Sequence, residues 1–416
     1  MENNPFVWDN HSDQPYILKD KEYKKRMRNK HKADWVSLIF KNLFLFPLGI
    51  LLSRVFKPQK IEIKNFFAMS VNLDKGEKQK ELIDELGCKN ILIRVPLSDI
   101  QNLQDYVTFA KEFKGCKILI NILQDREHIE DKVLLRTDIE KIFKSFKGIS
   151  EEFQVGNAIN RTKWGFFSVQ EYLDFYLIVH NIKEESFKEY KLLGPSVIDF
   201  EYHYAIRALF SKMPVYFDKV AALLYVDRRG APENTQMMTF DTTKKIDFLY
   251  SLASLAKMSS NKLVITEVNW PLSNTAPYAP TSEKECVDEE TYARYMLRYY
   301  LLALGTQKVE TVYWHQLIAS GYGLIDARKG LRKRPAFEVF KIMLQFLQES
   351  TFCEYKKAGD LYILQFKDKK DKKFDVLWTT GREIPLEDAK EVYDMFGKKL
   401  SGDISISESP IYAYSK

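Results

Sequence analysis

The fold of this chain is decided by the stretch Lys262-Leu263-Val264-Ile265-Thr266-Glu267. Its aliphatic run is short and lies between a lysine and the sequence Val268-Asn269-Trp270-Pro271, which is typical of a buried strand. In a parallel β/α barrel the functional side chains lie at the carboxyl ends of the strands. Glu267 stands at such an end. It is therefore a candidate catalytic residue, and the chain should hold seven more strands of this kind.

Seven other apolar runs share the length and the boundaries of this one, and helical patterns alternate with them. One helix is opened by the capping box Ser168-Val169-Gln170-Glu171. The expected strands are Phe66–Val71, Asn90–Val95, Lys117–Ile122, Phe153–Gly156, Leu192–Pro195, Val220–Tyr225, Leu263–Thr266 and Thr311–Trp314. Eight alternating units predict a parallel sheet and favour a closed (β/α)8 barrel. A doubly wound open sheet is the alternative, although no glycine-rich dinucleotide turn follows the first strand.

The pattern divides the chain into three parts. Residues 1–60 combine a basic arm with an apolar segment, and residues 61–350 hold the barrel pattern. In residues 351–416 short runs such as Leu361–Phe366 and Phe374–Trp378 are joined by a lysine-rich turn. This last part predicts a small antiparallel β domain.

Charge is spread unevenly along the 416 residues. The net charge is +6, and eight Lys and Arg residues fall between Lys19 and Lys32, against Asp20 and Glu22. The rest of the chain is nearly balanced, which argues against a nucleic-acid-binding protein. The basic run fits either a solvated arm or a segment attracted to anionic lipid, where each basic residue contributes about 1 kcal/mol.

An apolar segment extends from Trp35 to Arg54, directly after the basic run. Lys41 and Asn42 interrupt it, so its continuous apolar part is shorter than the roughly 20 residues of a spanning helix. The leading region is too long for a signal peptide. We interpret residues 19–56 as a segment that lies on a membrane surface, expected to be a bacterial inner membrane, on either side of it. A marginal spanning helix and a helix packed on the barrel floor are the alternatives.

Cysteine and histidine form no recognisable pattern. The four cysteines, Cys88, Cys116, Cys286 and Cys353, are scattered, and the six histidines show no metal-binding spacing. We therefore expect no disulfide framework, no metal site and no cofactor.

Polar and aromatic side chains stand at the ends of the expected strands, although the runs that lead to them are apolar. In chain order they are Arg94, Asn157, Ala158, Asn160, Tyr225, Asp227, Glu267, Trp270, Trp314 and His315. Aromatic rings beside carboxylates and amides suit a sugar, whose ring has an apolar face and a polar rim. Arg94 follows three aliphatic residues, so its charge should face inward and keep Glu267 ionised. Structural roles are the alternative: ion pairing for Arg94, and core packing for Tyr225 or Trp314.

This ordered set resembles the clan A glycoside hydrolases, most nearly the family 39 and family 5 type, over about residues 61–350 and into the β domain. The resemblance implies that Glu267 is the nucleophile and that Arg94 supports it. It also implies that Trp314 forms the floor of the sugar site.

The strand-four motif departs from the family's pattern. The family ends this strand with an Asn-Glu pair whose glutamate is the acid/base, and here Gly156-Asn157-Ala158-Ile159-Asn160 has alanine at that position. The resemblance assigns the sugar 2-hydroxyl to Asn157. A retaining enzyme places two carboxyl groups about 5–5.5 Å apart, and general acid–base help is worth about 10²–10⁴-fold. Turnover should therefore be severely slowed, while sugar binding survives.

Three explanations of Ala158 are open. The glutamate has been replaced deliberately, or catalysis has been lost naturally in a glycan-binding protein. The third is that another acid substitutes, for which Asp227, Glu201 and Glu152 are the candidates.

Two functions follow from the resemblance. The first is a retaining β-glycoside hydrolase, acting at a membrane on a surface or lipid-linked polysaccharide. The second is a non-catalytic glycan-binding or scaffold protein of an envelope glycan assembly system, with an envelope-complex partner. A carbohydrate and a membrane surface are the expected partners of the first function.

Overall fold

The computed structural model describes residues 6–58, 61–387 and 389–415; residues 1–5, 59 and 60 of the expected N-terminal segment lie outside the described residues. Eight parallel strands close into a barrel in the order β10-β3-β4-β5-β6-β7-β8-β9. They are β3 (Phe67–Val71), β4 (Asn90–Pro96), β5 (Lys117–Leu123), β6 (Glu152–Val155), β7 (Lys191–Ile198), β8 (Lys219–Leu223), β9 (Leu263–Val268) and β10 (Val309–Trp314). The expected (β/α)8 barrel is confirmed, and each strand lies within a few residues of its expected bounds.

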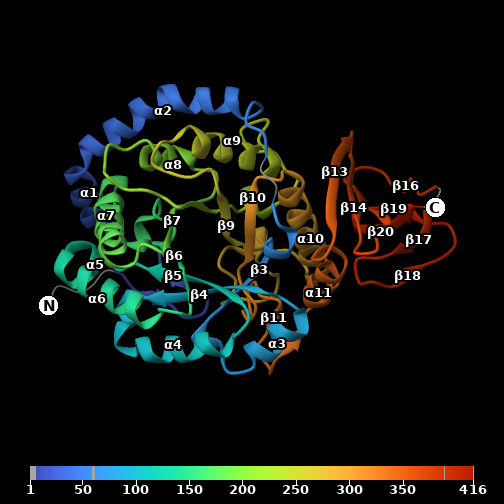
Figure 1. The fold of residues 1–416 in the computed structure, drawn as a ribbon, viewed down its shortest axis with the longest axis horizontal. Coiled ribbons are helices and arrows are strands. Elements are labelled where there is room, and N and C mark those ends of the chain that lie inside the picture. Colours follow the sequence, from blue (N-terminus) through green and yellow to red (C-terminus); the bar gives the residue numbers. More distant parts are fainter. Residues whose placement is uncertain (1–5, 59–60, 388, 416) are drawn as a thin grey trace.

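Helices surround the barrel (Figure 1). They are α3 (Gln79–Leu86), α4 (Leu103–Glu112), α5 (Arg126–Glu130), α6 (Lys132–Ser145), α7 (Val169–Ser186), α8 (Tyr202–Leu209), α9 (Thr242–Leu255), α10 (Glu289–Gly305) and α11 (Pro335–Leu347). Their starts follow from the sequence. The Ser168 hydroxyl accepts a hydrogen bond from the Glu171 N–H at 3.0 Å, as the capping box predicts, and Pro335 occupies the first turn of α11.

Side chains inside the barrel form layers, because each strand turns alternate residues inward. One layer is apolar and contains Ala68, Leu92, Leu119, Leu193, Ala221, Val264 and Tyr313. Two residues farther along the chain stand the buried polar residues Arg94 in β4, Asn121 in β5 and His315 just after β10. The barrel is therefore sealed by apolar packing and becomes polar at the carboxyl ends of its strands, where the candidate site lies.

A six-stranded antiparallel sheet in the order β13-β14-β15-β20-β17-β18 lies beside α10 and α11 (Figure 1). Its strands are β13 (Thr351–Ala358), β14 (Leu361–Lys367), β15 (Lys373–Thr379), β17 (Ala389–Tyr393), β18 (Lys399–Leu400) and β20 (Ile411–Ser415), with a small pair of β16 (Ile384–Pro385) and β19 (Ser405–Ile406). Phe346 of α11 stacks on Tyr412 with 4.1 Å between ring centroids. The Trp378 indole donates to Glu233, which also pairs with Arg298 of α10. The expected antiparallel β domain is thus packed firmly on the barrel.

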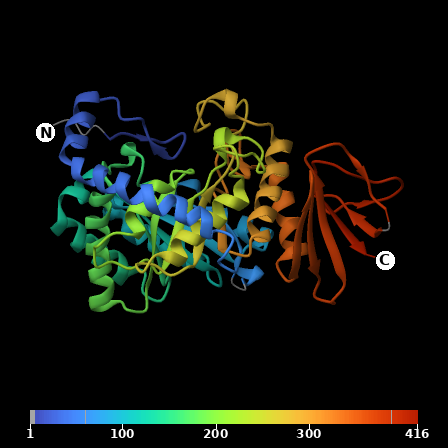
Figure 2. The ribbon, with the colours of Figure 1, turned by 90° about the horizontal axis from the view of Figure 1, so that it is seen from above.

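The N-terminal segment forms a hairpin of β1 (Trp8–Asp9) and β2 (Gln14–Pro15), followed by α1 (Lys21–Lys30) and α2 (Lys32–Leu52). Figure 2 shows the hairpin above one end of the barrel and α2 along its flank. The Gln14 side chain donates to the carbonyl of Pro280, in the loop after β9, at 3.3 Å. The hairpin therefore covers the carboxyl ends of the strands.

Helix α2 packs on α8 and α9, on the outside of the barrel and not on its floor (Figure 1). Asp34 pairs with Arg207 of α8 at 2.6 Å. Lys41 donates to the carbonyl of Phe210, and Asn42 to that of His203 at 3.0 Å. The two polar residues that interrupt the apolar run therefore point at the barrel.

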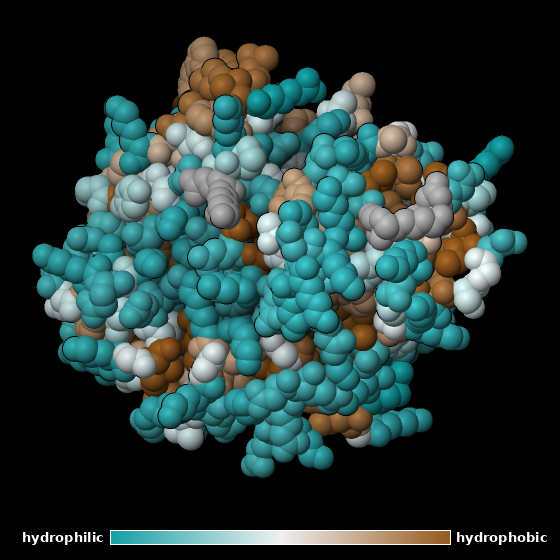
Figure 3. Space-filling view, turned by 45° about the vertical axis from the view of Figure 1, so that its right-hand side comes forward, coloured by the Kyte–Doolittle hydropathy of each residue, from teal (hydrophilic) through white to brown (hydrophobic). Residues whose placement is uncertain are grey.

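The outward face of α2 is apolar. Its exposed side chains include Val36, Ile39, Phe40, Leu43, Phe44, Leu48 and Leu51. Apolar atoms also gather at the upper edge of Figure 3, over the part of the molecule that α2 crosses in Figure 1, whereas the face turned to the viewer is largely hydrophilic. Among the described residues, α2 is the one helix long and apolar enough to cross a membrane by length and composition.

We predict unequal effects for two leucine substitutions on α2. Leu38 is 6% exposed and packs in the barrel core, whereas Leu43 is 64% exposed. Leu38→Ala should lower the free energy of unfolding by about 2–4 kcal/mol, and Leu43→Ala should change it by less than about 0.5 kcal/mol. Urea unfolding of both variants in the same buffer checks this, and equal effects would contradict the packing of α2.

Candidate active site

Glu267 lies near the end of β9 with both carboxylate oxygens hydrogen-bonded. Its Oε2 accepts from a guanidinium nitrogen of Arg94, in β4, at 2.5 Å, and its Oε1 accepts from the Tyr225 hydroxyl, after β8, at 2.5 Å. Glu267 is 8% exposed and Arg94 is 5% exposed. A buried carboxylate is tolerated where it is paired and hydrogen-bonded. Arg94 and Tyr225 therefore fix both the charge and the orientation of Glu267.

The electrostatics favour the ionised form of Glu267. Burial raises its pKa, but the neighbouring His315 and Arg94 and the hydrogen bond from Tyr225 lower the pKa to about 2. Burial and the charge of Arg94 lower the pKa of His315 to about 3, so this imidazole is neutral at pH 7. At neutral pH, Arg94 is therefore the cation that keeps Glu267 a carboxylate.

The loop after β6 brings Asn157 to the same cavity. Its Oδ1 accepts from Asn121 Nδ2 at 3.3 Å and from Gln154 Nε2 at 3.1 Å. The Gln124 side chain binds its backbone N–H and C=O, each at 2.8 Å. Its buried Nδ2 has no hydrogen-bond partner among the described residues. The amide is thus held in one orientation and keeps a donor for a ligand oxygen.

Ala158 stands next to Asn157 and is completely buried. It has a φ of 46°, and Gly156 has a φ of 79°, so the chain passes through the left-handed region at both residues. The methyl group of Ala158 belongs to the apolar core and borders the cavity. This position can neither give nor take a proton.

The cavity that these residues line has a volume of about 210 Å³. Its charged lining residues are the cations Arg94, Arg161, Lys163 and Arg229 and the anions Asp13, Asp199 and Glu267. Burial lowers the pKa of Lys163 to about 8, an effect that Glu267 partly offsets. The cavity is polar and lined by more cations than anions.

One wall of the cavity comes from the N-terminal hairpin, through Ser12, Asp13 and Gln14. A second cavity, of about 460 Å³, lies on the other side of the hairpin, and Asp13, Arg94, Lys163 and Trp164 line both cavities. The hairpin therefore divides the mouth of the barrel. Sequence reasoning missed these hairpin residues, and it missed Arg161, Lys163, Arg229 and Tyr322 as well. A count of charged residues in the loops after strands four and six could have found Arg161, Lys163 and Arg229, whereas nothing local marks the hairpin.

Trp314 and Trp270 are both completely buried and do not line the cavity. Their rings stack with 5.9 Å between centroids and 17° between planes. The Trp314 indole donates to the Tyr292 hydroxyl at 2.6 Å, and the Trp270 indole donates to the carbonyl of Arg229 at 2.9 Å. The two tryptophans thus lie beside the site as packed support.

Asn160 and Asp227 also lie outside the lining of the 210 Å³ cavity. Asn160 is engaged with the neighbouring strand: its Nδ2 donates to the Ile198 carbonyl at 3.0 Å and to Glu201 at 2.7 Å. Asp227 opens a one-turn 3-10 helix. Of the predicted site residues, the structure brings together Arg94, Asn157, Ala158, Tyr225, Glu267 and His315.

The carboxyl groups considered as substitutes for the acid/base lie elsewhere. Glu152, at the amino end of β6, pairs with Lys117 at 2.8 Å and Lys219 at 3.0 Å. Glu201 pairs with Arg161 at 2.6 Å on the far side of that arginine. Neither these two nor Asp227 lines the cavity with Glu267.

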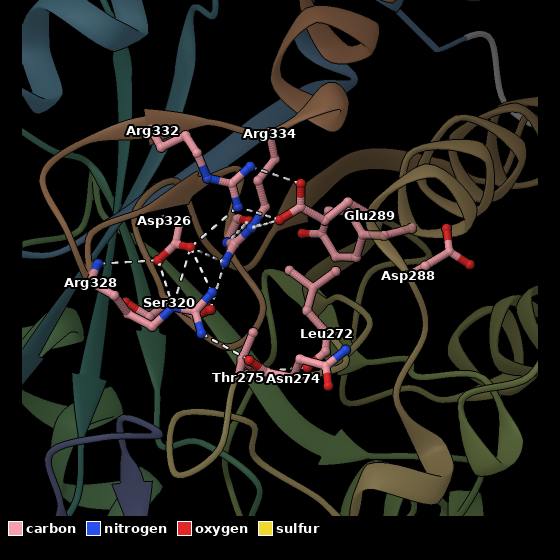
Figure 4. Close-up of polar contacts among 12 residues, drawn as sticks. Leu272, Asn274, Thr275, Asp288, Glu289, Ser320, Asp326, Arg328, Arg332 and Arg334 are labelled. Carbon is pink, nitrogen blue, oxygen red and sulfur yellow. Dashed lines mark hydrogen bonds and ion pairs between the residues drawn. The ribbon is translucent and has the colours of Figure 1, made fainter.

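A network of arginines braces the loop after β10 (Figure 4). Arg334 is completely buried and donates to the carbonyls of Ala319, Ser320 and Gly323 at 2.9, 2.6 and 2.7 Å. Asp326 pairs with Arg328 at 2.8 Å, in the loop that holds the pair of β11 (Ile325–Asp326) and β12 (Arg332–Lys333). This loop carries Tyr322 and Gln316 to the mouth of the barrel, so the network fixes that side of the site.

The site holds a buried, charged carboxylate at the edge of a polar cavity. Among the described residues, no group of three or more His, Cys, Asp and Glu side chains is arranged to hold a metal ion.

Solved structures with a similar fold are clan A glycoside hydrolases. A family 39 glycoside hydrolase from the gut symbiont Bacteroides cellulosilyticus WH2 matches with a TM-score of 0.68 and 14% identity, over 86% of this chain and 83% of its own. A GH30 endoxylanase from Clostridium papyrosolvens C71 matches with a TM-score of 0.58 and 11% identity, over 86% and 97%. A GH51 arabinofuranosidase from Xanthomonas axonopodis pv. citri matches with a TM-score of 0.55 and 12% identity, over 86% of this chain and 98% of its own.

At such identities the likeness is one of fold. No family model matches the sequence, and no curated protein matches it.

We predict that Glu267→Gln destabilises the protein in a pH-dependent way. The pKa of Glu267, about 2, lies below the ordinary 4.5, so its stabilising effect is complete above about pH 4.5 and is lost as the pH falls through 2. At pH 7 the variant leaves Arg94 without its buried partner and should lose about 3–5 kcal/mol. The difference from the unmodified protein should shrink toward pH 2 in urea unfolding. The exposed Glu77→Gln is the control, and a pH-independent difference would contradict the assignment.

Proposed function

We propose that this chain is a barrel of the retaining β-glycosidase type that binds a glycan and carries Glu267 as its nucleophile, without the acid/base. The observation that carries the proposal is the buried, ionised Glu267, held by Arg94 and Tyr225 at the carboxyl ends of the strands. The folds of glycoside hydrolases with several specificities support it. Asn157 offers its free amide donor to a sugar hydroxyl of the bound glycan.

The chemistry of the site is half of a retaining mechanism. A Glu267 oxygen attacks the anomeric carbon, the bond from that carbon to the leaving oxygen breaks with its electron pair going to that oxygen, and a glycosyl ester forms. Until then the charge of Arg94 stabilises the carboxylate. The leaving oxygen then needs a proton, which the methyl group of Ala158 cannot supply. Glycosides whose leaving group departs as a stable anion do not require protonation of the leaving oxygen. Such substrates should therefore glycosylate Glu267, whereas ordinary glycosides should react slowly.

A non-catalytic glycan-binding or scaffold protein is the second candidate. Two observations favour it: Ala158 is completely buried, and the hairpin lies across the mouth of the barrel. The two candidates differ in whether Glu267 reacts.

We predict that 2,4-dinitrophenyl β-glycosides react with the unmodified chain. A panel of pentosides and hexosides should include one that releases a burst of dinitrophenolate and adds the mass of one sugar to Glu267. Azide should accelerate the later release, because it needs no general base. Absorbance and mass spectrometry of the digested protein measure both events.

The controls separate the two candidates. Glu267→Gln should abolish burst and adduct, and Ala158→Glu should speed hydrolysis of unactivated glycosides by about 10²–10⁴-fold. If no glycoside labels Glu267 while glycans still bind, the chain is a non-catalytic glycan-binding or scaffold protein and not a glycosidase.

We further propose that the outward face of α2 rests on an anionic bilayer, so that the glycan is a surface or lipid-linked polysaccharide. The helix presents apolar side chains outward and keeps Lys41 and Asn42 against the barrel. The preceding α1 exposes Lys25, Arg26 and Arg28. Apolar burial combined with basic attraction is how a helix lies in a membrane interface.

We predict that the full chain floats with vesicles of phosphatidylcholine and phosphatidylglycerol more strongly than with phosphatidylcholine alone. Replacing the exposed Phe40 and Phe44 together by serine should weaken partitioning at least about tenfold, because each ring loses its burial in lipid. Serine at the exposed Val133 and Met238, away from α2, should leave partitioning unchanged. Equal flotation of both double variants would refute the assignment of this face.

A further inference from the structure

Asp13 is a buried carboxylate that the proposed reaction does not use. Its oxygens accept hydrogen bonds from Lys75 Nζ at 2.8 Å, Gln316 Nε2 at 2.7 Å and the Tyr322 hydroxyl at 2.8 Å. Arg94 donates to its backbone carbonyl at 3.2 Å. Donors from the loops after β3 and β10 thus converge on one carboxylate.

Contacts within the barrel hold two of these donors, Gln316 and Tyr322, although the Tyr322 hydroxyl also donates to the Ser12 carbonyl of the hairpin at 3.2 Å. Asn72 Nδ2 donates to Gln316 Oε1, and the Gln79 side chain binds the N–H and C=O of Asn72 at 3.1 and 2.7 Å. The acceptor end of the Gln316 amide is thereby occupied, and its donor end faces the site. Tyr322 is 1% exposed and stacks on His315 at 5.5 Å. The result is a preformed receptor for a carboxylate.

The hairpin does not need Asp13 for its own fold. Its turn is closed by Asp9, whose carboxylate accepts from the His11 N–H at 3.0 Å, the Ser12 hydroxyl at 2.6 Å and the Tyr16 hydroxyl at 3.1 Å. The hairpin has two residues in each strand, and an isolated two-stranded hairpin is marginal in water. The contacts of Asp13 therefore anchor a weak element across the cleft.

The carboxylate receptor adjoins the nucleophile. One guanidinium nitrogen of Arg94 binds the Asp13 carbonyl and another binds Glu267. The hairpin also separates two cavities that share Arg94 and Asp13. A glycan with a ring at Glu267 must therefore pass through the place that the hairpin occupies.

We propose that Lys75, Gln316 and Tyr322 form a subsite for the carboxylate of an acidic sugar, a uronic acid residue of the glycan, and that Asp13 fills this subsite as an internal competitor until substrate displaces the hairpin. The inference rests on the proposed glycan-binding function and adds the class of substrate. A neutral sugar in the same place would leave the largely buried Lys75 with the exposed Asp74 as its partner, and an ammonium deprived of its buried partner is costly.

The test compares the full chain with its Asp13→Gly variant. Glycine accepts the φ of 52° at this position, so the backbone is kept and the carboxylate is removed. The variant should bind glucuronate or galacturonate about 10- to 100-fold more tightly than the unmodified chain, as expected for regained hydrogen bonds to a charged group. Glucose and galactose should show no such gain by titration calorimetry. Asp74→Asn, which removes the other carboxylate beside Lys75, should not increase the affinity for either uronate.

Two further measurements complete the test. Adding Lys75→Met to Asp13→Gly should abolish the gain, and hydrogen exchange of the unmodified chain should show residues 6–16 opening when glucuronate is added. Hydrogen exchange of residues 6–16 that stays unchanged at saturating uronate would overturn the proposal. This measurement uses the unmodified chain, so it decides the question even if Asp13→Gly does not fold. Equal binding of neutral and acidic sugars would overturn the uronate subsite and keep the glycan-binding function, whereas binding of no sugar at all would remove both.

Discussion

The structure of the site depends on the ion pair between Arg94 and Glu267. β4 and β9 are separated by β3 and β10 in the closed sheet, so this pair spans the interior of the barrel mouth. A charge in such surroundings is stable only with its counter-charge and with its remaining hydrogen bonds made. The Tyr225 hydroxyl supplies one of these bonds to Glu267, and the Asp13 carbonyl takes one from Arg94. The orientation of Glu267 and the position of the hairpin therefore depend on the same guanidinium group.

This arrangement explains why the site is chemically asymmetric. On one side stands a carboxylate that stays ionised at any ordinary pH. The same cavity is lined by Ala158, by the cationic side chains of Arg161 and Lys163, and by Asp199, which pairs with Arg161 at 2.6 Å. The positive charges in this lining favour an acidic or polar ligand. Under the proposed function, binding and turnover are therefore separable in this molecule.

The sequence predicts the parts of the site that obey local periodicity. Arg94 and Glu267 each end an aliphatic run, and the carboxyl ends of parallel strands share one face of a barrel, so their meeting could be expected. Asp13 could not be found this way, because its contacts with Lys75 and Gln316 depend on where a short N-terminal hairpin lies in space and no pattern encodes it. Trp314 was expected to form the floor of the sugar site. In the structure Trp314 stacks on Trp270 beside the site, and the periodicity of the strand does not determine this packing.

The sequence of helix α2 contains a helical pattern of barrel-facing residues that is easily taken for interruptions of an apolar run. Asp34, Leu38, Asn42 and Gly49 recur at helical spacing, and all face the barrel. Asn42, which interrupts the apolar run, therefore belongs to the stripe that faces the barrel, and the exposed side of the helix is the apolar one. The basic α1 lies between the hairpin and α2 in the chain, and Met27 of α1 and the preceding Leu18 pack against Phe167. Under the proposals above, its cations stand between the lipid surface and the mouth of the barrel. Positive charge along that path raises the local concentration of an acidic glycan. The same attraction to negative charge therefore favours attachment to the membrane, approach of the glycan and its binding in the barrel.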